Sequence, residues 1–324
     1  MKTLVIGGAG YIGSHVVLAL KDAGHEVGVY DNLCHGTREN LFPDTPFVEA
    51  DILDEEKLTS VLGQGWDAVI HLAALKAAGE SMVDPDSYAQ NNISGTITIL
   101  RAMSKAACRI LVFSSSAAVY GEPHYLPVDE KHPTNPENFY GFTKLEIERI
   151  LEWYHQLRGL RFSALRYFNA AGYDPDGRVH GLEQNPANLL PVIMEVAVGR
   201  RPKLQVFGTD YETPDGTCIR DYVHVSDLAD AHVASVEALA RGEDNIICNL
   251  GSETGISVRE MLDASRRITG LEIPAVEAER RPGDPARLVA GSALARERLD
   301  WEAKRSDVET LVRTSFQAYR AHAG

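Results

Sequence analysis

Tyr140 and Lys144 are the two residues whose types and spacing most directly suggest chemistry. The stretch from 142 to 158 contains no Pro or Gly and suits a helix, in which residues four apart share one face. A tyrosine alone is a poor base at neutral pH because its unperturbed pKa is about 10, whereas a nearby ammonium favours the phenolate. The pair therefore predicts a proton-transfer device. The alternative is a surface tyrosine beside a solvated lysine, which this short motif taken alone would favour.

Three glycines, Gly7, Gly10 and Gly13, separate the first apolar segment from the first amphipathic one. Glycines so spaced allow a tight turn, close approach of a pyrophosphate and close helix–strand packing, with the helix N-terminus facing the phosphates. Asp31 ends the next expected strand, where it could bind a ribose diol and repel a 2′-phosphate. This context favours NAD binding over NADP binding and over a simple Gly-rich turn.

Two further polar groups follow expected strands. Asp51 and Ile52 come after the third strand, where they could read an adenine amino group, and a helix N-cap at Asp51 fits equally well. Ser114 to Ser116 follow the strand that ends at Phe113. Ligands of open α/β sheets bind beyond the carboxyl ends of the strands, so these hydroxyls should face the cofactor. Serine-rich turns are also common structurally.

The first half of the chain alternates strand and helix patterns. Near-continuous apolar strands in a βαβ rhythm predict an α/β protein with a doubly wound, parallel Rossmann-type sheet covered on both faces. The expected strands are 3–6, 26–30, 47–48, 67–71, 109–113 and 162–167, and the expected helices are 11–23, 55–62, 88–107 and 140–157.

The rhythm breaks after Asn169, where Pro- and Gly-rich loop signals begin. We expect a dinucleotide-binding domain at 1–170, to which a segment near 220–250 returns, and a smaller C-terminal α/β domain at 171–324. The helices expected in this second half are 189–198, 227–240, 258–269 and 307–322.

Composition limits the classes of partner. The chain has 324 residues and a net charge of −14, which argues against nucleic acid but permits an anionic small molecule where a few arginines converge. No apolar run approaches membrane-span length, and the N-terminus resembles a buried strand rather than a signal peptide, so we expect a cytoplasmic protein with no membrane partner. The four cysteines form no C-x-x-C pair and fit neither a zinc site nor a disulfide framework; they are Cys34, Cys108, Cys218 and Cys248.

The order of glycine fingerprint, serine cluster and Tyr-x-x-x-Lys resembles the extended short-chain dehydrogenase/reductase superfamily. Finer matches are similar to the UDP-glucose 4-epimerase family, and they extend from the first strand nearly to residue 300. The matching blocks are 7–15, 31–33, 69–76, 114–116, 166–169, 188–189, 220–224 and 281–284.

This resemblance implies roles for the residues around the first pair. Tyr140 is the implied base, Lys144 lowers its pKa and holds the nicotinamide ribose, and Ser116 assists proton transfer. NAD is the implied cofactor. Its contacts, from the fingerprint and the resemblance together, are Gly7, Gly10, Tyr11, Ile12, Gly13, Asp31, Asn32, Asp51, Ile52, Leu72, Ala73, Ala74, Lys76, Asn91, Ser114, Tyr140, Lys144 and Tyr167.

The resemblance also implies a UDP-sugar substrate. Arg220 and Arg281 match the family's pyrophosphate-binding arginines, and guanidinium forks suit phosphate oxygens. Salt bridges to Asp221 and Asp284 are the alternative, and they could coexist with this role. The implied substrate contacts are Lys76, Ser116, Tyr140, Asn169, Asn188, Leu189, Phe207, Arg220, Tyr222, Arg281, Asp284 and Leu288.

The implied reaction is a transient oxidation at the sugar C4, rotation of the flat 4-keto sugar about its phosphate linkage, and hydride return to the other face. Three positions depart from the family pattern. Leu72 replaces an aromatic residue of many members, and Ala118 replaces a threonine. Leu288 lies where a bulky aromatic accompanies strict glucose/galactose enzymes and a smaller residue accompanies acceptance of N-acetylated sugars. Acceptance of N-acetylated sugars therefore stays open.

Three other functions fit the same fold. A nucleotide-sugar 4,6-dehydratase would carry Asp-Glu after the residue matching Ser116, where this chain has Ala117 and Ala118. An epimerase acting on another UDP-sugar, such as an N-acetylated sugar, a uronic acid or a pentose, is a second alternative. A non-catalytic NAD-binding sensor is a third, but such sensors tend to lose the Tyr-x-x-x-Lys pair.

The resemblance further implies a homodimer, built on helices matching 88–107 and 140–157. Apolar residues at helical spacing could form that surface, or could only pack on the sheet. They are Ile93, Ile97, Leu100, Ile147, Ile150, Leu151 and Tyr154.

Overall fold

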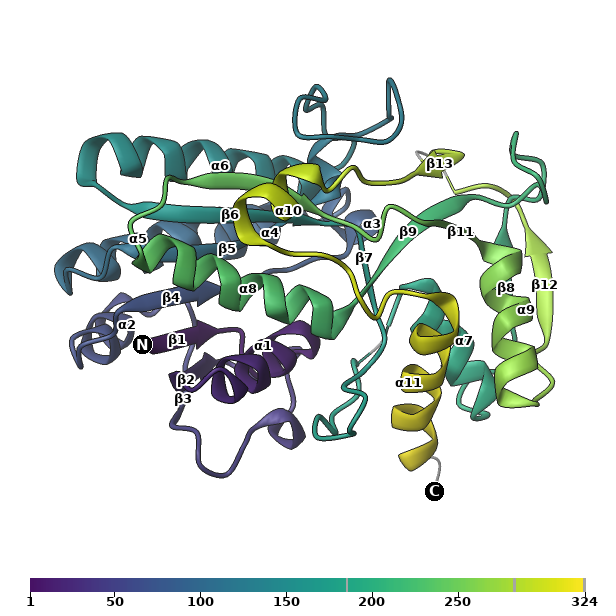
Figure 1. The fold of residues 1–324 in the computed structure, drawn as a ribbon, viewed down its shortest axis with the longest axis horizontal. Coiled ribbons are helices and arrows are strands. Elements are labelled where there is room, and N and C mark those ends of the chain that lie inside the picture. The colour runs from purple at the N-terminus through teal and green to yellow at the C-terminus, as the bar shows by residue number, and fades with distance from the viewer. Residues whose placement is uncertain (185, 282–283, 323–324) are drawn as a thin grey trace.

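The computed structural model describes residues 1–184, 186–281 and 284–322. Its centre is a seven-stranded sheet of order β10-β6-β5-β4-β1-β2-β3, in which every neighbouring pair is parallel (Figure 1). This arrangement confirms the predicted doubly wound α/β fold. The strands are β1 (Lys2–Ile6), β2 (Glu26–Asp31), β3 (Phe47–Glu49), β4 (Ala68–His71), β5 (Ile110–Ser116), β6 (Arg161–Tyr167) and β10 (Ile246–Leu250).

Alternate residues of each strand face opposite layers of helices. In β1, Val5 faces one apolar core with helices α1 and α8, whereas Leu4 and Ile6 face a second core with α2, α5 and α6. Both faces of the sheet are therefore covered, as the near-continuous apolar strands require. These helices are α1 (Tyr11–Asp22), α2 (Glu55–Leu62), α5 (Gly95–Lys105), α6 (Phe139–Arg158) and α8 (Val225–Ala240).

Helix α6, which carries Tyr140 and Lys144, has clear signals at both ends. The Asn138 side chain caps its N-terminus by accepting a hydrogen bond from the Gly141 backbone N–H at 2.9 Å. Its C-terminus stops at Gly159, which adopts a left-handed conformation with φ of 66°. The predicted helix at 140–157 is confirmed to within a residue.

The helix expected at 88–107 is instead divided into three pieces. They are α4 (Pro85–Tyr88), a π-helical segment η2 (Ala89–Ser94) and α5. The wide π turn accompanies an inward position of Asn92, which is 1% exposed and whose amide donates to the Leu75 carbonyl at 3.0 Å and to Thr143 Oγ1 at 3.1 Å. A tertiary contact thus overrides the regular helical pattern.

A smaller group of elements lies beyond the carboxyl ends of the large sheet (Figure 1). A second sheet has the order β11-β9-β13, with β7 paired to β9, and β8 pairs with β12. These strands are β7 (Asn169–Ala171), β8 (Leu204–Phe207), β9 (Ile219–His224), β11 (Gly255–Ser257), β12 (Ala275–Ala278) and β13 (Arg287–Leu288). The helices α7 (Leu189–Ala197), α9 (Val258–Thr269) and α11 (Val308–Ala321) agree closely with those expected, and the short elements are α3 (Ala78–Ser81), α10 (Ala293–Leu299), η1 (Arg38–Asn40) and η3 (Ala117–Val119).

Three of the seven apolar residues expected on an intersubunit surface do not lie on any surface. Leu100, Ile147 and Leu151 are at most 1% exposed and belong to the core under the sheet, so that expectation is wrong for them. They pack on the sheet because the helix faces that carry them are the inner faces. The other four are half-buried: Ile93, Ile97, Ile150 and Tyr154.

Within the described ranges, no helix is long and apolar enough to span a membrane, and no three His, Cys, Asp or Glu side chains are grouped to hold a metal ion. All four cysteines are free thiols, and three of them are buried.

Candidate active site

The parallel register brings the predicted site segments to one edge of the sheet. Ile6 of β1 pairs with His71 of β4, which pairs with Phe113 of β5, so the segments that follow these strands lie side by side. Ser116 at the end of β5 is likewise in register with Tyr167 of β6. The glycine turn, the loop after β4 and the serine cluster therefore share the edge at which open α/β sheets bind ligands.

The three fingerprint glycines have different steric requirements. A Cβ at Gly7 would lie 2.6 Å from the Ala73 backbone nitrogen, and a Cβ at Gly13 would lie 2.0 Å from the Gly7 carbonyl oxygen. The protein's own packing therefore requires glycine at both positions. At Gly10 a Cβ would meet only the Gly7 carbonyl oxygen at 3.4 Å, an ordinary contact, and the backbone φ of −77° suits any residue. A need for glycine at position 10 would come from a ligand rather than from the fold.

Helix α1 starts directly after this turn, and no side chain caps it. Its first backbone N–H groups thus remain available to an anion, which the helix dipole also favours. Of the two residues that open the helix, Tyr11 donates its hydroxyl to the Gly172 carbonyl at 2.5 Å, whereas Ile12 packs on the core beneath α1. Tyr11 therefore reaches across to the smaller group of elements.

Asp31, at the end of β2, lies beside the same turn. Its carboxylate accepts the Ala9 N–H at 3.0 Å and the Leu33 N–H at 2.8 Å. Burial raises the pKa of Asp31, and these two hydrogen bonds act in the opposite direction. Because an ionised carboxylate has about four acceptor positions, capacity remains for a diol.

Asp51 caps a turn rather than a helix. Its carboxylate accepts the Asn32 amide at 2.8 Å and the Leu53 N–H at 2.9 Å, whereas the N-cap of α2 is Asp54. The N-cap alternative for Asp51 is therefore wrong. Asn32 and Asp51 together form a polar edge next to Asp31, while Ile52 is buried in the core beneath α5.

The loop after β4 is fixed by a residue that sequence reasoning missed. Asn92 accepts the Leu75 N–H at 2.9 Å and donates to the Leu75 carbonyl at 3.0 Å, so one amide holds this loop from both sides. The predicted contact Asn91 donates its side-chain amide to Asn92 Oδ1 at 2.9 Å. Residues 72–74 are half-buried in the same loop. The available signal was a pair of asparagines in an otherwise helical pattern, but only the π turn points the second one inward.

Lys76 ends this loop and forms an ion pair with Glu183. Glu183 belongs to the segment before α7, and its side chain is 10% exposed, whereas that of Lys76 is 57% exposed. The pair joins the loop after β4 to the smaller group of elements.

Tyr140, Lys144 and Ser116 lie together. The Lys144 ammonium donates to the Ser114 carbonyl at 2.7 Å and lies 5.7 Å from the centroid of the Tyr140 ring. Ser116 lies close enough to Tyr140 to act on its pKa, and the Ser116 Oγ accepts the Ala118 N–H at 3.1 Å. Lys144 is only 2% exposed, so the alternative of a solvated surface lysine is wrong.

The proton affinities of this trio differ from the sequence expectation. Burial raises the pKa of Tyr140, and Ser116 opposes the rise. Burial also lowers the pKa of Lys144 to about 7, with the Glu148 carboxylate acting against it. The expectation of a lowered Tyr140 pKa is therefore wrong for the protein's own groups, because desolvation outweighs the opposing effect of Ser116. At neutral pH the protein alone holds Tyr140 as the phenol.

A buried ion pair between Glu148 and Arg166 lies near Lys144, and the Glu148 charge acts on the Lys144 pKa. Glu148, four residues further along α6, accepts Arg166 Nε at 2.9 Å and Nη2 at 2.5 Å, together with the Ser115 hydroxyl at 2.5 Å. Arg166 also donates to the Tyr120 hydroxyl at 2.9 Å. Each buried charge thus has partners, which a buried charge needs. The i,i+4 spacing of Lys144 and Glu148 was the available signal, but nothing local identified Arg166 as the partner.

Tyr167, the predicted contact at the end of β6, is 7% exposed. Its hydroxyl lies 3.4 Å from His232 Nε2, and Ser114 opposes the rise in the Tyr167 pKa that burial causes. Tyr167 therefore lies beside β5, the strand that carries Ser116 and whose Ser114 carbonyl accepts the hydrogen bond from Lys144.

On the substrate side, Arg220 keeps one unused donor group. Its Nη1 donates to the Pro285 carbonyl at 2.7 Å, and its Nη2 lies 3.3 Å from the Asp284 carboxylate. Buried Nη2 nevertheless makes no hydrogen bond to any described residue. The predicted salt bridge with Asp284 is present, and the guanidinium can still donate to a phosphate oxygen.

Arg281 stacks on an aromatic ring. Its guanidinium carbon lies 4.0 Å from the centroid of Phe207, and the residue is exposed. Stacking fixes the plane of the guanidinium and leaves its edge free to donate. Arg281 and Phe207, which are both predicted substrate contacts, therefore lie together.

Leu288 lies beside Arg220 through strand pairing. Residue 288 of β13 is in register with residue 220 of β9, and its side chain packs on the cluster that includes Ala117 and Val119 of η3. Because η3 directly follows Ser116, the structure brings Leu288 close to the catalytic candidates.

The other predicted substrate residues occupy varied environments. Asn169 donates its amide to the Asp221 carbonyl at 2.9 Å, and Tyr222 is 3% exposed. Asn188 is exposed at the start of α7 and makes no side-chain cap, whereas Leu189 packs on the apolar cluster that includes residues of α7, α9 and α11. Asn188 therefore presents an exposed polar side chain that caps no helix.

Comparison with known proteins identifies the class. Residues 3–251 match the NAD dependent epimerase/dehydratase family, and the chain belongs to that family. It is 45% identical to the UDP-glucose 4-epimerases of Halalkalibacterium halodurans and Lacticaseibacillus casei, covering 99% of this chain and 96% and 98% of theirs. A crystal structure of UDP-glucose 4-epimerase from Brucella ovis in complex with NAD superposes with a TM-score of 0.96 at 44% identity over 98% of each chain.

Gly10→Ala should weaken NAD binding without weakening the fold, because a Cβ there meets no protein atom closer than 3.4 Å. We expect the free energy of unfolding to change by less than about 0.5 kcal/mol. NAD retained by the purified protein, measured after gel filtration, should fall. Gly79→Ala, where a Cβ meets nothing within 4 Å, is the matched control and should retain NAD. Full NAD content in Gly10→Ala would show that no ligand approaches this turn closely.

Proposed function

We propose that this chain interconverts UDP-galactose and UDP-glucose by a transient oxidation at C4 of the sugar, with NAD as its cofactor. The observation that carries the proposal is the grouping of half-buried Tyr140 and Ser116 with buried Lys144 at the carboxyl edge of the sheet. Full-length relatives at 45% identity that are named UDP-glucose 4-epimerase support the choice of substrate.

The residues at the glycine turn fit NAD. Open space above Gly10 and the uncapped start of α1 suit a pyrophosphate, and Asp31 with spare acceptor capacity suits a ribose diol. When bound, NAD supplies the acceptor for the C4 hydride and, in its oxidised form, a positive charge. Lys144 would hold the nicotinamide ribose, and the loop at 72–76 would line the cofactor.

Tyr140 would move the proton of the sugar 4-hydroxyl. The phenolate form needs a neighbouring positive charge, because burial alone raises the pKa of Tyr140. Lys144 supplies such a charge only below its own pKa of about 7, unless a further charge or substrate shifts that value. Ser116 donates or accepts a hydrogen bond as the proton moves between Tyr140 and the sugar.

The substrate would be anchored at its pyrophosphate. Arg220 offers the unused Nη2 donor, and Arg281 offers a guanidinium edge oriented by Phe207. Fixing the UDP part firmly while the sugar is held mainly by apolar contacts, among them Leu288, lets the 4-keto sugar turn over between the two hydride steps.

We infer that residues 1–170, with the segment near 220–250, bind NAD and that the rest of 171–324 binds the UDP-sugar. We further infer a cytoplasmic role in galactose metabolism from the proposed substrate pair.

We also infer that the protein is a homodimer joined through α5 and α6. The outer face of α6 carries Trp153 and Leu157, which are 61% and 71% exposed, next to half-buried Ile150 and Tyr154. Large apolar side chains gathered on one exposed helix face commonly mark an interaction surface. A paired helix from a second copy would cover them.

Tyr140→Phe should retain NAD and lose turnover, because it removes the hydroxyl while keeping the ring that packs in the site. The wild-type protein, given UDP-galactose, should form UDP-glucose, and the variant should be slower by about 10² to 10⁴. Products are resolved by chromatography, and bound NAD is measured in the same samples. Near-normal kcat in the variant would remove Tyr140 from the proposed role, and absence of UDP-glucose with wild-type protein would overturn the proposed function.

Trp153→Glu should convert the protein to a monomer, since a carboxylate cannot be buried unpaired in an apolar interface. Light scattering at micromolar concentration should give a dimer mass for the wild-type protein and half that mass for the variant. Leu271→Glu, which changes a 40% exposed apolar residue after α9, is the control and should stay dimeric. A monomeric wild-type protein would refute the dimer.

A further inference from the structure

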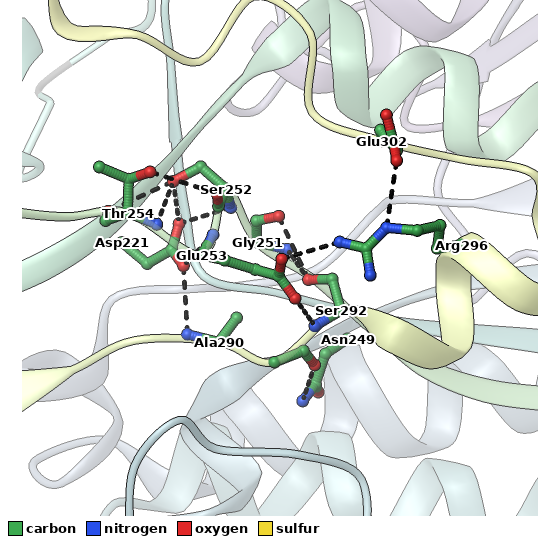
Figure 2. Close-up of polar contacts among 11 residues, drawn as sticks. Asp221, Asn249, Gly251, Ser252, Glu253, Thr254, Ala290, Ser292, Arg296 and Glu302 are labelled. Carbon is green, nitrogen blue, oxygen red and sulfur yellow. Dashed lines mark hydrogen bonds and ion pairs between the residues drawn. The ribbon is translucent and has the colours of Figure 1, made fainter.

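The Asp221 carboxylate is the centre of a polar network on the substrate side of the molecule (Figure 2). The residue is 0% exposed and belongs to β9. One carboxylate oxygen accepts the backbone N–H and the hydroxyl of Ser252, each at 2.7 Å, and the other accepts the N–H groups of Glu253 at 3.0 Å and Ala290 at 3.1 Å. Four donors from two separate segments therefore converge on one side chain.

These four bonds make Asp221 unsuited to bind a ligand itself. A carboxylate has about four acceptor positions, and all of them are used here. Burial raises the pKa of Asp221, and the converging donors oppose that rise, as a buried anion requires. Any influence of Asp221 on a substrate must therefore act through the residues that it holds.

Those residues adjoin substrate residues of the proposed site. Arg220 precedes Asp221 in β9, and Leu288 of β13 is in register with Arg220. Ala290, whose N–H Asp221 binds, lies two residues after Leu288, so the carboxylate ties β13 to β9 where β13 ends. The segment before β13 in turn holds Arg220, which donates to the Pro285 carbonyl at 2.7 Å. The Asp221 carbonyl also accepts the Asn169 amide at 2.9 Å.

A second tether prevents this segment from moving away. Glu253 adopts a left-handed backbone with φ of 61°, and its carboxylate accepts the Ser292 N–H at 2.7 Å and pairs with Arg296 at 2.8 Å (Figure 2). The Gly251 N–H also donates to the Ser292 hydroxyl at 2.9 Å. On the opposite side, the Val128 N–H donates to the carbonyl of residue 289 at 2.8 Å.

The packing inside the network leaves no room for adjustment. A Cβ at Gly251 would lie 2.2 Å from the Ala290 Cβ and 2.7 Å from an Asp221 carboxylate oxygen. The Gly251 backbone is therefore in close contact with the side chains of Asp221 and Ala290, and the placement of these three residues depends on the bonds that Asp221 accepts.

We propose that Asp221 is a positioning residue for the UDP-sugar: it sets the placement of Arg220, which would grip the pyrophosphate, relative to Leu288, which would form the wall of the sugar pocket. The inference rests on the proposed function of that site. A residue that served stability alone would lower the unfolding temperature without changing how the substrate binds, and this difference is measurable.

The test compares Asp221→Asn with Asp227→Asn. Asp227 is also buried, at 1% exposed, and accepts hydrogen bonds from Arg305 and Ser306, neither of which is a proposed substrate contact. In Asp221→Asn an amide NH₂ replaces an oxygen that accepts N–H groups, so at least one donor loses its partner. Both variants should unfold at lower temperature than the wild-type protein.

Substrate binding should separate the two variants. UDP affinity, measured by calorimetry, and KM for UDP-galactose should each worsen by about tenfold or more in Asp221→Asn, with a smaller change in kcat and unchanged bound NAD. Asp227→Asn should keep both constants. Ser252→Ala, which removes one donor and should fold even if Asp221→Asn does not, should shift UDP affinity in the same direction by a smaller factor.

Wild-type UDP affinity and KM in Asp221→Asn and Ser252→Ala, together with a lowered unfolding temperature, would overturn the positioning role. UDP binding is measured without turnover, so it also separates this inference from the proposed function. A wild-type protein that binds UDP but forms no UDP-glucose would refute the epimerase proposal, while weaker UDP binding in Asp221→Asn would still support the role of Asp221.

Discussion

The constraint on which the rest of this structure depends is the burial of a lysine ammonium at the carboxyl edge of the sheet. Lys144 is 2% exposed and donates to the Ser114 carbonyl, so its charge must be compensated from within the protein. Glu148 and Arg166 form a buried ion pair, and the Tyr140 ring centroid lies 5.7 Å from the Lys144 ammonium. Burial brings the Lys144 pKa to about 7, which makes its charge sensitive to any anion or cation that binds nearby. Burial raises the pKa of Tyr140, which hinders it as a base. The same burial makes that pKa sensitive to the charge of a bound cofactor.

The order of the strands brings the segments proposed to bind two ligands to one edge of the sheet. β1, β4 and β5 are adjacent and parallel, which places the glycine turn, the loop at 72–76 and the serine cluster in one row. After β6 the chain forms β7 and β9, which pair in parallel. Later in the chain, β13 also pairs in parallel with β9. The Asp221 network fixes this pairing, so the residues proposed to grip the substrate are positioned by long-range contacts rather than by their own loop.

The sequence predicted those parts of the fold and site that depend on local patterns. Apolar runs located strands of the large sheet, and the order of glycine fingerprint, serine cluster and Tyr-x-x-x-Lys singled out Gly7, Tyr140 and Lys144. The π turn at Asn92 was not predictable, because its cause is a contact with Leu75. The spacing of Glu148 from Lys144 could suggest an interaction between them. The partner of Glu148, Arg166, lies on β6, and no local pattern links the two. The direction of the Tyr140 pKa also depended on burial, which a list of neighbouring charges does not contain.

The central claim is that the hydrogen at C4 leaves the sugar and returns to the same molecule while Tyr140 handles only the hydroxyl proton. UDP-galactose carrying deuterium at C4 tests it most directly in ordinary water. The account predicts that the UDP-glucose formed retains the deuterium at C4, as measured by mass spectrometry and NMR of the isolated product. Replacement of that deuterium by solvent hydrogen would contradict the account, since it would mean that C4 itself exchanges its hydrogen with water.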